Sequence, residues 1–224
     1  MLARDATTFK KTRVAPVFDQ LLARDPSGAS WLSKLLAVAS RHADPLFPLR
    51  PTLVGDVRAK RLSLAHKDPG TVALALKYLR NGKRGRHWFV LEGPSRPDAL
   101  LETTDIVVCV EGKRTEAGGT TQTSWMPRRS QLVRHMDAAT DKFKGKSVLG
   151  LLIVEGSGVD PREPLPHWHT ECEKQYAPKM LADSLPHRSR EEQTAIGNNI
   201  LGVTTWQAVC AATGIDWAAL PDTA

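Results

Sequence analysis

Two runs rich in apolar and β-branched residues constrain the fold of this chain more than any other part of its sequence. IVVCVEGK at 106–113 and SVLGLLIVEG at 147–156 have the composition and length of buried strands. DALLE at 98–102 is predicted to pair with the first run as a hairpin, and HWFVLEG at 87–93 is a further predicted strand. Helical patterns separate and flank these segments, so we expect an α/β protein whose central mixed β-sheet is flanked by α-helices.

Helices are predicted where apolar residues recur at helical spacing. Ser30 is expected to cap the second helix, and Pro127 to lie near the first turn of the fourth. PREPLPHWHTE at 161–171 is expected to be a proline-rich loop. The predicted helices cover residues 17–25, 28–42, 71–80, 127–146 and 204–214.

The order of these segments divides the chain into three regions. We expect an N-terminal helical region over 1–65, a core over 66–160, and a C-terminal helical and loop extension over 161–224 packed on that core. A chain of 224 residues can bury one substantial core without a disulfide or a structural metal.

Charge and cysteine content indicate which cellular compartment and which class of binding partner to expect. The net charge of +7 and the pI near 9.5 suit a polyanionic partner such as nucleic acid. The three cysteines, Cys109, Cys172 and Cys210, are widely spaced and odd in number, which argues against a disulfide framework or a CxxC metal site. The N-terminus has charges where a signal peptide needs an apolar core, and no apolar run approaches the roughly 18 residues of a membrane span. We therefore expect a cytoplasmic protein that does not associate with membranes.

Charged residues stand at the ends of the predicted hairpin strands. Because side chains alternate across a strand, Glu111 and Lys113 project from the same face. A two-residue turn at 103–104, or a four-residue turn centred there, pairs Asp98 with Cys109 and places Asp98 on that face too. A register shifted by one residue would send Asp98 to the opposite face.

Two carboxylates and one ammonium group on one face suit phosphodiester hydrolysis. Asp98 and Glu111 offer oxygen ligands for Mg²⁺, and Lys113 could orient a water or stabilise the transition state. A simpler interpretation remains, since Glu and Lys two residues apart on a strand commonly form a solvated ion pair. Asp105 would replace Asp98 if the hairpin were drawn differently, although its position is better explained by turn formation.

The spacing of these residues resembles a known signature. Pro97-Asp98, a twelve-residue gap and then Glu111-Gly112-Lys113 at a strand end, followed by a basic helix, is similar to the motif of the PD-(D/E)XK nuclease superfamily, which includes restriction endonucleases and DNA-repair nucleases. The resemblance covers roughly residues 70–156. It implies a restriction-endonuclease-like core with the hairpin at the centre of its sheet, and the activity of a Mg²⁺- or Mn²⁺-dependent deoxyribonuclease.

The resemblance also implies a role for each matching residue. Asp98 and Glu111 would bind the metal, the backbone carbonyl of Gly112 would be a further ligand, and Lys113 would be the catalytic lysine. Many members of the superfamily add an acidic residue from the helix before the sheet, and the predicted helix 71–80 has none. The weak substitutes are Asp19, Asp56 and Glu92.

The helix after the hairpin supplies a further candidate. Some members place a polar residue there that points back at the site, and Gln131, Arg134 and His135 lie on one side of this helix. Gln131 is the best candidate, because its amide could hold a phosphate or the attacking water without adding charge. Glu116 could close the site electrostatically. A solvated polar face is the alternative interpretation.

Basic segments lie on both sides of the hairpin in the sequence. Lysine and arginine there would contact phosphates in a salt-dependent manner that is indifferent to base sequence. The candidates for nucleic-acid binding are Lys83, Arg84, Arg86, Arg128, Arg129 and Arg134. HWHTEC at 167–172 invites a zinc interpretation, but no second ligand cluster completes a tetrahedral set, and a packed Trp168 is expected instead.

Two kinds of function compete for this pattern. The first is a metal-dependent nuclease that acts on DNA, with a homodimer or a larger defence or repair complex as its assembly, since cutting both strands requires two active sites. The second is a noncatalytic nucleic-acid-binding or assembly subunit with a nuclease-like fold. Carboxylates on opposite faces, or a Lys113 held in an ion pair away from any cleft, would favour the second.

Overall fold

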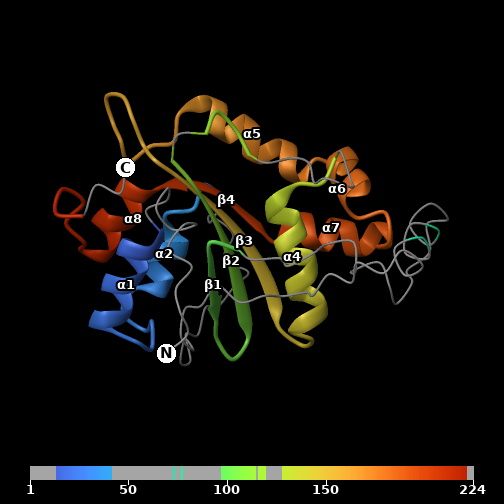
Figure 1. The fold of residues 1–224 in the computed structure, drawn as a ribbon, viewed down its shortest axis with the longest axis horizontal. Coiled ribbons are helices and arrows are strands. Elements are labelled where there is room, and N and C mark those ends of the chain that lie inside the picture. The colour runs from blue at the N-terminus through green and yellow to red at the C-terminus, as the bar shows by residue number, and fades with distance from the viewer. Residues whose placement is uncertain are drawn as a thin grey trace.

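A four-stranded mixed sheet organises the chain. The computed structural model describes residues 14–41, 73, 77, 97–114, 116–119 and 128–220. The strands are β1 (Ala99–Glu102), β2 (Ile106–Lys113), β3 (Ser147–Val154) and β4 (Ile200–Thr205). They lie in the order β1-β2-β3-β4, with β1 antiparallel to β2 and the other neighbouring pairs parallel. The expected α/β architecture with a mixed sheet flanked by helices is confirmed (Figure 1).

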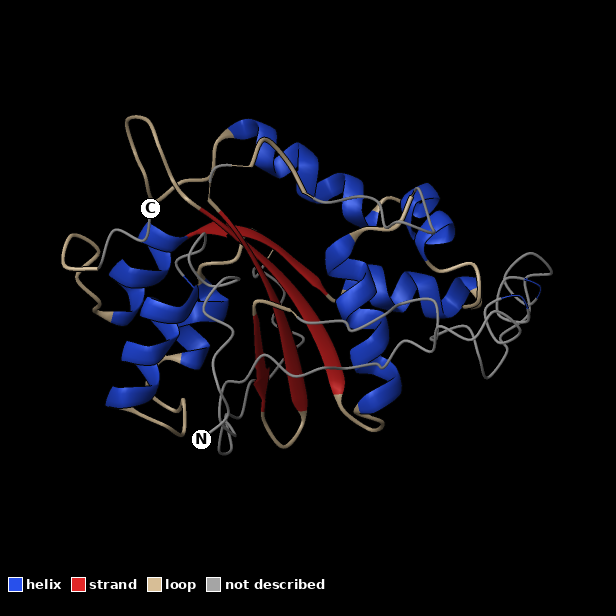
Figure 2. Ribbon diagram, in the orientation of Figure 1, coloured by secondary structure: helices blue, strands red, loops and turns tan. Residues whose placement is uncertain are grey.

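Helices cover both faces of this sheet (Figure 2). One face carries α1 (Val14–Arg24), α2 (Leu32–Ala37) and α8 (Trp206–Thr213). The other carries α4 (Gln131–Lys142), α5 (Pro166–Tyr176), α6 (Pro178–Ser184) and α7 (Arg190–Asn198). A sheet buried on both faces explains why IVVCV and VLGLLIV are continuously apolar rather than alternating.

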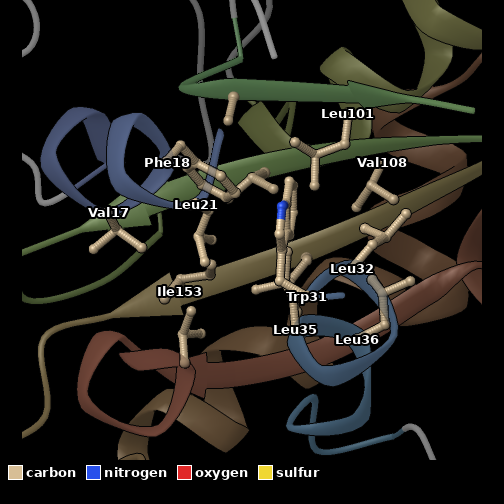
Figure 3. Close-up of a cluster of buried hydrophobic side chains, with 14 of the residues drawn as sticks. Val17, Phe18, Leu21, Trp31, Leu32, Leu35, Leu36, Leu101, Val108 and Ile153 are labelled. Carbon is tan, nitrogen blue, oxygen red and sulfur yellow. The ribbon is translucent and has the colours of Figure 1, made fainter. Parts of the chain in front are cut away.

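Alternate side chains of the strands enter two separate cores. In the first, Leu101 and Val108 meet Phe18 and Trp31 of the N-terminal segment (Figure 3). In the second, residues such as Leu100 and Cys109 pack beneath α4. The hairpin face that carries the charged residues at its end therefore faces α4.

Several predicted elements appear where the sequence indicated them. The strands near 98–102, 106–113 and 147–156 and the helices near 17–25 and 204–214 are confirmed. The predicted strand 87–93 lies outside the described residues. So does the predicted helix 71–80, except for Ala73 and Lys77, which are helical.

Three local predictions were wrong. Ser30 does not cap α2, which begins at Leu32; its hydroxyl donates instead to Asp25 Oδ2 at 2.7 Å. Helix α4 begins at Gln131, later than predicted, because the Oγ of Ser130 accepts the N–H of Val133 and caps it. The expected loop at 161–171 becomes α5 from Pro166, since proline is accommodated in the first turn of a helix.

The C-terminal region supplies a strand to the sheet and is more than a helical and loop extension packed on the core. The N-terminal segment runs along this strand, with Ser40 N donating to Val203 O at 3.1 Å and Arg41 N donating to Leu201 O at 2.9 Å. The described parts of both terminal regions therefore belong to the same folded unit as the hairpin. The three cysteines are free and buried. None of the described helices is long and apolar enough to cross a bilayer.

Candidate active site

The register of the hairpin sets the position of Asp98. Ala99 pairs with Val110 and Leu100 pairs with Cys109, so the predicted pairing of Asp98 with Cys109 was wrong by two residues. A shift of two keeps side chains on the same face, and it brings Asp98 closer to Glu111 than predicted.

Thr103 explains the difference in register. Its backbone N–H donates to Ile106 O at 2.8 Å, and its hydroxyl accepts the N–H groups of Asp105 and Ile106. The turn is therefore centred on Thr104 and Asp105, one residue later than predicted. Asp105 is exposed in this turn, at the opposite end of β2 from Glu111, and does not belong to the site.

Asp98 is tied to the end of β2 by a backbone hydrogen bond. Gly112 N donates to Asp98 Oδ2 at 2.8 Å. Burial, and then the negative charge of Glu111, raise the pKa of Asp98 to about 7. The negative charge of Glu111 therefore disfavours ionisation of Asp98.

Glu111 and Lys113 form a buried ion pair on the same face. Lys113 Nζ lies 2.8 Å from Glu111 Oε1, and the two residues are 6% and 3% exposed. On the other carboxylate oxygen, His135 Nε2 lies 3.3 Å from Glu111 Oε2. Burial opposes ionisation of Glu111, but His135 and Lys113 outweigh it, and the pKa of Glu111 lies below its usual range.

Helix α4 presents two polar residues to this pair. Gln131 stands in its first turn with Oε1 3.5 Å from Lys113 Nζ, and His135 follows one turn later. The predicted side of this helix does face the hairpin. His135 was recognised there from its spacing but had no assigned role, because nothing in the sequence indicated that it would reach Glu111.

Glu116 lies at the rim of the site. It is exposed, its Oε2 accepts the N–H of Arg114 at 2.8 Å, and its charge also raises the pKa of Asp98. Of the substitutes for a second acidic ligand, Asp19 is exposed on α1, which packs on the opposite face of the sheet. Asp56 and Glu92 lie outside the described residues.

The candidates for nucleic-acid binding have different surroundings. Arg129 is fully buried, with Nη2 3.0 Å from Asp137 Oδ2, so its predicted contact with phosphate was wrong. Arg128 is exposed and forms an ion pair with Asp183 at 3.2 Å, and Arg134 is half-buried on α4. Lys83, Arg84 and Arg86 lie outside the described residues.

The donor set can be tested against a divalent cation. Among the described residues, no three His, Cys, Asp or Glu side chains form a metal-ligating group. Mg²⁺, however, is commonly held by one or two carboxylates and keeps several waters. Glu111 Oε2 is buried without a full hydrogen bond among the described residues; His135 Nε2 lies 3.3 Å from it, and Asp98 is a neighbour. Two neighbouring carboxylates, Asp98 and Glu111, are oxygen ligands of the kind that Mg²⁺ or Mn²⁺ takes.

The histidines of α5 do not join this site or form a second one. His167 is exposed, Cys172 is buried in the core beneath the helix, and Trp168 is packed as predicted.

Comparisons of this chain with protein-family models, with curated proteins and with solved structures give no match.

Proposed function

We propose that this protein is a Mg²⁺- or Mn²⁺-dependent nuclease of the PD-(D/E)XK type that hydrolyses phosphodiester bonds of DNA. The observation that carries the proposal is the meeting of Asp98, Glu111 and Lys113 on one face of the hairpin, with Gln131 in reach of Lys113. The order of hairpin and following helix in β1, β2 and α4 agrees with the core that the resemblance implies, although β1 lies at the edge of the described sheet and not at its centre.

Each residue of the site has a role in this proposal. Asp98 and Glu111 would hold the cation, together with the backbone carbonyl of Gly112. When bound, the cation would lower the pKa of a coordinated water and neutralise charge on the phosphate. Lys113 places a positive charge at the carboxylates, where it orients the water or stabilises the developing charge. Gln131 positions the lysine head group and offers an amide to the phosphate.

The proposed partner is DNA, and the proposed location is the cytoplasm. The net charge of +7 supports affinity for a polyanion that depends on salt concentration, and Arg128 is an exposed contact candidate. Cutting both strands would require two copies of the site, so we propose a homodimer or a larger defence or repair complex.

A second function is favoured by the burial of the site. Glu111 and Lys113 are almost completely covered, and their ion pair is formed without any ligand. A noncatalytic nucleic-acid-binding or assembly subunit would retain this arrangement. The two functions differ in metal-dependent cleavage, which only the first provides.

The test is cleavage of supercoiled plasmid and labelled single strands with Mg²⁺, Mn²⁺ or EDTA. Lys113→Ala is expected to reduce cleavage at least about 100-fold, while Lys34→Ala, exposed on α2 across the sheet, should cleave like the wild type. Binding without cleavage by any variant would favour the noncatalytic subunit. Cleavage that survives in Lys113→Ala or in EDTA would contradict the proposed site.

A further inference from the structure

One contact beside the candidate site has no role in the function proposed above. His135 is 2% exposed, and its Nε2 lies 3.3 Å from the buried Oε2 of Glu111. Lys113 occupies the other oxygen of the same carboxylate at 2.8 Å. The two oxygens of Glu111 are thus approached by cationic or N–H groups from two elements, β2 and α4.

The position of His135 is fixed by the packing of α4. Met136, the next residue, lies so close to Gly150 of β3 that a Cβ there would collide with its sulfur. On the side away from the hairpin, Asp137 is fully buried and contacts Arg129 at 3.0 Å and Arg188 at 2.6 Å. These contacts prevent α4 from rotating about its axis, so the imidazole is held against the end of β2.

A glutamate bonded to Lys113 at one oxygen and faced by His135 at 3.3 Å from the other has little rotational freedom before any ligand arrives. Each carboxylate oxygen has two lone pairs, so contacts with Lys113 and His135 leave one on each oxygen for a cation. Groups that orient a ligating side chain typically change metal affinity by about 10- to 100-fold.

We propose that His135 is a positioning residue that holds Glu111 in the orientation that binds a divalent cation. This inference rests on the proposed function, because it assigns His135 to the same site. Its role is to orient the carboxylate through an N–H group at the position of Nε2, and it does not require contact with the substrate.

Mn²⁺ binding to the intact chain tests the inference without relying on catalysis. Titration calorimetry should show that His135→Leu binds Mn²⁺ about 10- to 100-fold more weakly than the wild type. His135→Gln places an amide N–H near the reach of Nε2 and should stay within about threefold. Thr140→Val, one turn further along α4 and outside the site, is the matched control.

Comparing His135→Gln with His135→Asn separates the role of the N–H group from any instability that leucine causes. His135→Asn has the same polarity as His135→Gln but an amide one carbon shorter, so it should lose affinity as His135→Leu does. Equal Mn²⁺ affinities for the wild type, His135→Leu and His135→Asn would overturn the role of His135 alone. An equal loss in His135→Gln and His135→Asn would overturn the role of the N–H group. A wild type that binds no Mn²⁺ would overturn both this inference and the metal-dependent nuclease.

Discussion

Replacing Asp98 by asparagine is expected to stabilise the protein at neutral and alkaline pH. Asparagine keeps an oxygen for the N–H of Gly112, which now bonds Asp98 Oδ2 at 2.8 Å, but it cannot ionise. Burial, and then Glu111, raise the pKa of Asp98 from 3.8 to about 7. A carboxyl whose pKa rises on folding stabilises the fold while protonated, so its contribution is complete below pH 3.8 and is lost as the pH rises through about 7. At about 1.36 kcal/mol per pH unit, ionised Asp98 lowers the free energy of unfolding by about 4 kcal/mol.

Urea denaturation followed by circular dichroism measures this effect. At about pH 8 in EDTA, we expect Asp98→Asn to unfold with a free energy at least about 2 kcal/mol above that of the wild type, since relaxation around the charge reduces the full value. The two free energies of unfolding should become equal toward about pH 4, where the carboxyl of Asp98 in the folded wild type is protonated. Asp105→Asn, exposed in the turn, should change stability by less than about 0.5 kcal/mol. A variant no more stable than the wild type at about pH 8, or a difference independent of pH, would refute the reasoning.

Three further predictions test other parts of the structure. Asp137→Asn leaves buried arginines without their carboxylate and should cost about 3–5 kcal/mol in urea melts. Asp183→Asn, which breaks a surface pair, should cost less than about 1 kcal/mol, and equal losses would contradict the buried network. Ser189→Ala removes the capping box of α7 and should cost about 1 kcal/mol, measured in the same way; no change would mean that the cap contributes nothing. Gln131→Leu should lower kcat for plasmid cleavage about tenfold, and unchanged kcat would exclude contact of Gln131 with the reacting groups.

The sequence predicted the strands well and the connections less well. IVVCV and VLGLLIV were recognisable because strands buried on both faces are continuously apolar. β4 was not predicted, because ILGVTT is short and contains Gly202, which adopts a φ of 104° where the register shifts. The predicted hairpin register was wrong because the Thr103 hydroxyl accepts two backbone N–H groups in the turn. The residue type alone does not predict these contacts.

In the candidate site, too, some residues could be placed from the sequence and others could not. The face shared by Asp98, Glu111 and Lys113 followed from strand alternation, which survives a register error of two residues. Arg129 was misassigned because a basic residue in a basic run gives no sign of burial. Its partner, Asp137, lies eight residues away on the far side of α4, and only the folded chain encloses the pair.

The electrostatics at Asp98 connect stability with function. An asparagine there would accept the same hydrogen bond from Gly112 and would avoid both the burial of a charge and the repulsion by Glu111, which raise the pKa of the aspartate. The hairpin end would then fold more easily, because neither burial nor Glu111 would oppose a charge at that position. The proposed function accounts for a carboxylate that opposes folding, because a divalent cation held between Asp98 and Glu111 would turn their repulsion into attraction. The same residue should therefore destabilise the metal-free protein and bind the cation, and Mn²⁺ should narrow the stability difference between the wild type and Asp98→Asn.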